Sequence, residues 1–173
     1  MSKLGSFWVL LFICSSCSHF GSNSEALNMQ REVNDSKKMR VDGFYFSLNK
    51  TSVPNADVYF FYRNGVVQHM GSVAENEFSI RLRDDKFLKK VRGQRVSWGL
   101  YRVVSDTIEF ERWYHAGGSE KLALLRKGII LNDSTFLINS VSSKKRGEYD
   151  STNELYHFKK FHPKPDSTNE FIE

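Results

Sequence analysis

Two cysteines carry the only thiols of this 173-residue chain, and both lie near its N-terminus. Cys14 and Cys17 follow the apolar run 7–13, and Lys3 places a positive charge before that run. A positive start, a short apolar run and small residues are typical of an export signal. Since no cysteine follows Cys17, the sequence excludes a disulfide framework in the exported protein.

The residues around the second cysteine suggest lipidation. Ser15 and Ser16 stand directly before Cys17, an arrangement that resembles the lipobox of Gram-negative bacterial lipoproteins. The resemblance implies that residues 1–16 form a signal peptide and that Cys17 carries acyl chains such as palmitate. Because Ser18 rather than an aspartate follows, it also implies the outer membrane of the cell envelope. Several acyl chains on one cysteine would make the anchoring effectively permanent. The alternative is an ordinary secretory peptide with incidental cysteines.

Basic side chains gather between residues 81 and 95, where only Asp84 and Asp85 oppose them. The basic residues of this stretch are Arg81, Arg83, Lys86, Lys89, Lys90, Arg92 and Arg95. Such a cluster predicts an anionic partner, such as lipid headgroups, an acidic glycan or a protein. Nucleic acid is not expected, because the chain has an export signal and no nucleic-acid-binding signature. The alternative is a solvated helix face.

Motifs for catalysis or metal binding are not evident. His157 and His162 are five residues apart and would point to opposite faces of a strand, while Glu109 and Glu111 have no third ligand at a helpful spacing. The sequence contains no phosphate-binding loop, Gly-x-Ser-x-Gly elbow or His-Glu-x-x-His motif. We therefore expect no metal, no cofactor and no enzymatic activity. A hydrolase whose two carboxylates are brought together by the fold is the alternative.

The composition predicts one globular domain that positions these residues. The chain is 40% hydrophobic and 26% charged, with only 3 prolines. Residues 17–41 are polar beyond the cysteine and show no sustained apolar period, so we expect a lipidated cysteine and a flexible tether there. Residues 42–173 are expected to form the domain, which ends in a short C-terminal tail.

Apolar residues alternate with a period near two from Val41 onward, which predicts an all-β antiparallel meander. Nine strands are expected, over residues 43–50, 56–63, 66–72, 77–83, 95–104, 107–115, 121–131, 134–141 and 154–161. The segment 84–91 is expected to form the one short helix. A long meander must protect its edge strands, so we expect closure into an up-and-down barrel, with a curled β-sandwich as the alternative.

Three two-residue turns predict the registers of three hairpins. Across the turn Asn64-Gly65, the expected opposite pairs are Tyr62 with Val67, Phe60 with His69, Phe61 with Gln68 and Tyr59 with Met70. Across Ser105-Asp106, they are Val103 with Ile108, Tyr101 with Phe110, Arg102 with Glu109 and Trp98 with Trp113. Across Asn132-Asp133, Ile129 is expected opposite Phe136. The charged pair Arg102 and Glu109 indicates that the face of the second hairpin on which both residues lie is exposed to water.

Several motifs resemble lipocalin-like bacterial lipoproteins of uncharacterised function. They are Trp98-Gly99-x-Tyr101, Asp106-Thr107-Ile108, the segment 128–133 and Tyr156-His157-Phe158. The resemblance covers most of residues 42–162 and implies a lipocalin-like barrel.

Aromatic residues make up 14% of the chain, more than the core of a small barrel obviously needs. The candidates for a ligand-binding or docking surface are Tyr59, Phe61, Met70, Trp98 and Trp113, unless they simply fill the core. We therefore expect a lipid-anchored, non-enzymatic envelope protein whose barrel binds a lipid or a small apolar molecule. The alternative is an accessory subunit of an envelope protein complex that has no ligand of its own.

Overall fold

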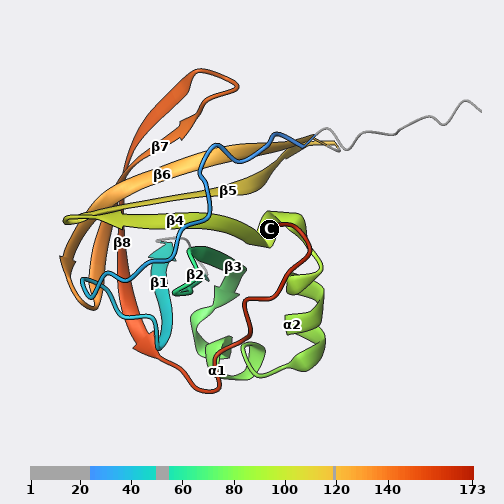
Figure 1. Cartoon of the computed structure of the whole chain (residues 1–173). Coiled ribbons are helices and arrows are strands. Elements are labelled where there is room, and N and C mark those ends of the chain that lie inside the picture. Colours follow the sequence, from blue (N-terminus) through green and yellow to red (C-terminus); the bar gives the residue numbers. More distant parts are fainter. Residues whose placement is uncertain (1–23, 50–54, 119) are drawn as a thin grey trace, which may run out of the picture.

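The computed structural model describes residues 24–49, 55–118 and 120–173, which form a closed antiparallel barrel (Figure 1). The strands are β1 (Gly43–Asn49), β2 (Asn55–Phe61), β3 (Val66–Ala74), β4 (Trp98–Val104), β5 (Thr107–Gly117), β6 (Glu120–Asn132), β7 (Thr135–Ser143) and β8 (Glu148–Lys160). Each strand pairs with the next, and β8 pairs with β1. The predicted meander barrel is confirmed. The predicted signal peptide and Cys17 lie outside the described residues.

A helical insertion separates β3 from β4. It contains the 3-10 turns η1 (Glu75–Glu77) and η2 (Arg95–Ser97) and the helices α1 (Phe78–Arg81) and α2 (Asp85–Arg92). The predicted short helix is confirmed as α2, whose first turn is capped by the carboxylate of Asp84.

The strand predicted over residues 77–83 is wrong, because the end of η1 and the helix α1 occupy this stretch. Phe78 and Leu82 are four residues apart and both are buried, while Ile80 between them is 69% exposed. This spacing brings Phe78 and Leu82 to one side of a helical turn, whereas in a strand Ile80 would share their face.

Two of the three predicted registers are off by one residue. The β4–β5 hairpin is confirmed, with Tyr101 opposite Phe110. In the β2–β3 hairpin, however, Tyr59 lies opposite His69. The connection has three residues rather than two, and Gly65 has φ +79°, as in the three-residue hairpin loop that ends in a left-handed residue. The shift brings His69 to the inner face of the barrel beside Tyr59.

The β6–β7 hairpin is the second register that differs from the prediction. Ile130, rather than Ile129, lies opposite Phe136, and the ladder shifts between Ile130 and Asn132. An irregularity of this kind adds a residue to one strand and exchanges the faces beyond it. Consequently Ile130 is buried and Ile129 is 46% exposed.

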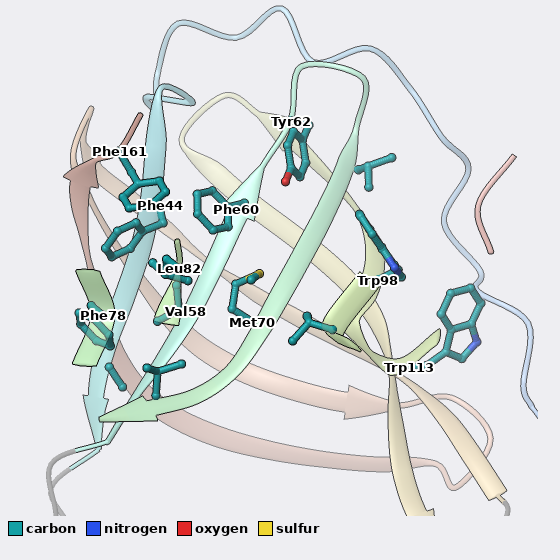
Figure 2. Close-up of a cluster of buried hydrophobic side chains, with 14 residues drawn as sticks. Phe44, Val58, Phe60, Tyr62, Met70, Phe78, Leu82, Trp98, Trp113 and Phe161 are labelled. Carbon is teal, nitrogen blue, oxygen red and sulfur yellow. The ribbon is translucent and has the colours of Figure 1, made fainter. Parts of the chain in front are cut away.

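The buried apolar residues form an inner and an outer cluster. The inner cluster fills part of the barrel with Met39, Tyr45, Tyr59, Phe61, Val67, Tyr101, Ile108, Phe110, Ile130, Phe136, Ile138 and Tyr156. The outer cluster includes residues of β1–β3, both helices and Phe161 of the C-terminal tail (Figure 2). The tail and the helices therefore give β1–β3 a second, outer core.

The chain before β1 is bound to the barrel rather than free. The backbone amides of Asn28 and Met29 donate to the buried carboxylate of Glu111, at 2.6 and 2.8 Å. The side-chain amide of Asn34 donates to the hydroxyl of Tyr101, and Met39 is 4% exposed within the inner cluster. The prediction of a flexible tether is therefore wrong for residues 24–41.

Candidate functional site

The wall of the barrel has a gap beside the helical insertion, because β4 is short. β3 pairs with β4 only over residues 66–68, and β5 pairs with β4 only as far as Arg112. The gap holds a cavity of about 740 Å³, which we name the α2 pocket. It is lined by His69, Met70, Gly71 and Ser72 of β3, by Arg112, Tyr114 and His115 of β5, and by Arg81, Asp84, Lys86, Phe87, Lys90, Val91, Gln94, Val96 and Ser97 of the insertion.

Arg112 is the buried cation among the residues that line the α2 pocket, and it is only 5% exposed. Its guanidinium donates to the hydroxyl of Tyr59 at 3.2 Å and to the carbonyls of Val96 and Trp113 at 3.0 and 3.1 Å. The guanidinium also lies 3.5 Å from the ring centroid of Tyr114.

No carboxylate of the described residues lies within 4 Å of Arg112. A buried charge is costly without an opposite charge nearby, and the three hydrogen bonds of Arg112 all go to neutral oxygens. Guanidinium groups also bind carboxylates and phosphates through parallel hydrogen bonds. The arrangement can therefore accept an anion.

His69 lies next to Arg112 in the pocket wall. Its Nε2 is buried, makes no hydrogen bond within the described residues and lies 3.5 Å from the carboxylate of Asp57. Burial and the positive charge of Arg112 lower the pKa of His69 to about 4. The imidazole is therefore neutral at pH 7 and adds a polar group, but no charge, to the pocket.

Asp57 stays ionised behind His69. Burial alone would raise the pKa of Asp57, but His69 and the hydroxyl of Ser72 outweigh this effect and lower the pKa to about 2. The Ser72 hydroxyl donates to the carboxylate at 2.9 Å. Asp57 does not line the α2 pocket, so its charge lies behind the cationic wall.

A second arginine inside the barrel has a counter-ion. Arg126 forms an ion pair with Glu154 and donates to the hydroxyl of Tyr114 at 2.8 Å. The hydroxyl of Tyr156 donates to the same carboxylate at 2.9 Å, and burial raises the pKa of Tyr156 well above its ordinary value. Arg126 is thus neutralised, whereas Arg112 is not.

The predicted basic cluster is divided between two roles. Arg81, Lys86 and Lys90 line the α2 pocket, where Asp84 is the single carboxylate of the lining. That carboxylate accepts hydrogen bonds from the amides at the start of α2. Lys89 is exposed on the same helix and does not line the pocket.

The remaining members of the cluster contact the C-terminal tail. Arg92 pairs with Asp166, 3.1 Å away, and Arg95 lies over the ring of Phe171. Arg83 lies over the ring of Phe161. From sequence these seven residues form one patch, because the partners in the tail are more than seventy residues away and no spacing pairs them.

The five candidate docking residues do not form an exposed surface. Their exposed fractions are 0% for Tyr59 and Trp98, 1% for Phe61 and Met70, and 4% for Trp113. Figure 2 shows Met70, Trp98 and Trp113 within the outer cluster. The predicted exposure is therefore wrong. Tyr59 and Phe61 belong to the inner cluster, whereas the helical insertion and the chain termini cover Met70, Trp98 and Trp113. Among the five, only Met70 lines the α2 pocket.

Sequence reasoning missed Arg112, His69 and Tyr114. A signal for Arg112 was present, since it follows Ile108 and Phe110 at alternate positions of β5 and so shares the predicted core face. A charged residue on a core face is unusual enough to mark a candidate site. His69 gave no such signal, because its face depended on the length of the preceding turn.

Three further findings concern metal sites, membrane-spanning helices and similar proteins. Within residues 24–49, 55–118 and 120–173, no group of three or more His, Cys, Asp and Glu side chains could hold a metal ion. None of the helices in this part of the chain is both long and apolar enough to cross a membrane. Neither a scan against protein-family models nor searches of the curated proteins and of the solved structures found a match to the chain.

Proposed function

We propose that this chain is a lipid-anchored envelope protein that binds a small organic anion in the α2 pocket and catalyses no reaction. The observation that carries the proposal is the guanidinium of Arg112, which lines the pocket and has no carboxylate of the described residues within 4 Å. A bound anion would supply the missing counter-charge.

The chemistry of the lining indicates an amphipathic ligand. Lys86 and Lys90 add cationic side chains, while Met70, Phe87 and Val91 add apolar ones. Ligand pockets typically have volumes of about 300–1,000 Å³, and the α2 pocket falls within that range. A carboxylate or phosphate ester with a short hydrocarbon chain fits this lining better than the small apolar molecule that the sequence predicted as one of two ligand classes, the other being a lipid.

The accessory-subunit role is the second candidate, and the inner cluster favours it. Phe61 lies between 4.9 and 6.2 Å, centroid to centroid, from five other aromatic rings of this cluster. That part of the barrel is filled by its own side chains, as in small barrels that hold no ligand. A protein without any ligand would then contact the other subunits of its complex through its surface alone.

Titration with octyl phosphate, followed by calorimetry, tests the anion site. In an Arg112→Met variant we expect binding to weaken about 10- to 100-fold, because hydrogen bonds to charged groups contribute about 1.5–3 kcal/mol each. Lys90→Met should weaken binding less, since Lys90 is exposed at the rim. Lys89→Met is the matched control and should bind like the wild type.

Two outcomes would contradict the anion site. The first is equal affinity of the wild type and both pocket variants, and the second is an equal loss in the Lys89→Met control. Native mass spectrometry of the protein purified from a Gram-negative host gives an independent check. A co-purifying organic anion that Arg112→Met releases would support the proposal, whereas a bare protein that also ignores octyl phosphate would favour the accessory-subunit role.

The lipid anchor needs its own experiment. Labelling of cells with radioactive palmitate should mark the wild-type chain and leave a Cys17→Ala chain unmarked as an unprocessed precursor. Continued labelling of Cys17→Ala would overturn the assignment of the acylated residue.

A further inference from the structure

Three lysines of α2 share one exposed side of the helix. Lys86, Lys89 and Lys90 are three and four residues apart and are all exposed, whereas Val91 is buried. None of the three forms an ion pair with a carboxylate in the part of the chain that the structure describes. The outer side of α2 is therefore a row of unpaired positive charges.

An exposed apolar residue lies on α1, which adjoins α2 because Arg81 of α1 lies over the ring of Phe87 of α2. Ile80 is 69% exposed, and Arg81 and Arg83 beside it are exposed as well, Arg81 in an ion pair with Glu77. We name these six residues the basic face: Ile80, Arg81, Arg83, Lys86, Lys89 and Lys90. Cations that surround an exposed apolar side chain complement a bilayer with anionic headgroups, because the apolar group can enter the interface that the charges approach.

The described chain begins close to the end of α2. Ser24 pairs with Lys121 and lines a crevice together with Gly93 and Gln94, which directly follow the helix. Figure 1 shows the start of the described chain and α2 on the same side of the barrel. Since an extended chain spans about 3.3–3.6 Å per residue, Cys17 lies at most about 25 Å from Ser24.

We infer that the basic face lies on the anionic surface of the membrane that holds the acyl anchor. The short distance from Cys17 keeps the end of α2 near the bilayer. The charges of the basic face then favour contact between this side of the barrel and the anionic headgroups. The inference rests on the acylation of Cys17 but does not require a ligand in the α2 pocket.

A fluorescent probe at two equally exposed positions tests the inference. Tyr149, in the β7–β8 hairpin, is 71% exposed and is the matched control for Ile80. Ile80→Cys and Tyr149→Cys proteins, purified in lipidated form, are labelled with nitrobenzoxadiazole and reconstituted into vesicles of phosphatidylcholine with or without phosphatidylglycerol. The rate of probe reduction by aqueous dithionite reports the exposure of each position.

In vesicles that contain phosphatidylglycerol, we expect reduction at position 80 to be about fivefold slower than at position 149, since the bilayer interface shields the probe. The difference should shrink in pure phosphatidylcholine. It should also shrink in an Arg83→Glu/Lys89→Glu double variant, because these two residues belong to the basic face but do not line the α2 pocket.

Equal reduction rates at the two positions in anionic vesicles would overturn the inference. So would shielding of position 80 that occurs only in native membranes and not in lipid vesicles, since that result would indicate a protein partner. The double variant should bind octyl phosphate like the wild type, because neither residue lines the α2 pocket. Membrane contact and anion binding are therefore measured independently, and either proposal can fail without the other.

Discussion

The inside of the barrel has an aromatic half and a charged half, although the same strands supply both. β2 contributes Phe61 to the aromatic half and Asp57 to the charged half, and β5 contributes Phe110 and Arg112 in the same way. The aromatic half is filled by touching rings, and Met39 of the N-terminal segment packs against it. The charged half borders the gap beside β4.

The difference between the halves shows how one small barrel can separate stability from binding. Burial of aromatic rings stabilises the fold in proportion to the apolar area removed from water. Burial of charged groups stabilises little or nothing, because desolvation offsets the attraction. We therefore expect substitutions in the aromatic half to change mainly stability and substitutions at Arg112 to change mainly binding.

The largest effect is expected in the aromatic half. Phe61 is 1% exposed and contacts five rings, so Phe61→Ala should lower the free energy of unfolding by about 3–5 kcal/mol. Urea unfolding followed by circular dichroism measures this change. A loss below about 1 kcal/mol would mean that the aromatic half is loosely packed and would weaken the comparison.

The next effect concerns pH and the charged half. The pKa of His69 is about 4 in the folded protein and about 6.5 in an unfolded chain. The unfolded state therefore binds more protons between these values, and the free energy of unfolding falls as the pH falls from 6.5 to 4. The expected contribution of His69 to this fall is about 3 kcal/mol.

Urea unfolding at pH 7 and pH 4 measures the contribution of His69. In His69→Gln, the loss of stability on acidification should be smaller than in the wild type by that amount. His115→Gln is the matched control, because His115 lines the same pocket but is exposed. Equal losses in the wild type and His69→Gln would show that His69 is not held neutral by its surroundings.

The smallest effect separates the two arginines. Arg126→Met leaves the carboxylate of Glu154 without its cation, and we expect this change to lower the free energy of unfolding by about 2 kcal/mol. Arg112→Met removes a charge that has no carboxylate partner and should cost at least about 1 kcal/mol less. Thermal unfolding without added anions compares the two. A larger cost for Arg112→Met would contradict a binding role for this charge.

The barrel was predictable because its strands alternate regularly and its hairpins are short. The same local reasoning predicted α2, where Asp84 provides the cap, and the hairpin between β4 and β5. Local reasoning failed at the β2–β3 turn, which has three residues instead of the predicted two and so places His69 on the inner face of the barrel. It also failed where partners are distant in sequence, as for Arg92 with Asp166 and for the N-terminal segment with Glu111. Arg112 was accessible to this reasoning, since its charge breaks the core pattern of β5.

Anomalous diffraction from crystals of the protein soaked in bromide tests the anion site most directly, because it locates a simple anion without assuming the natural ligand. We predict a bromide ion in contact with the guanidinium of Arg112, inside the α2 pocket. Bromide bound only at exposed cations such as Lys89, with none beside Arg112, would contradict this prediction and the proposed function that rests on it.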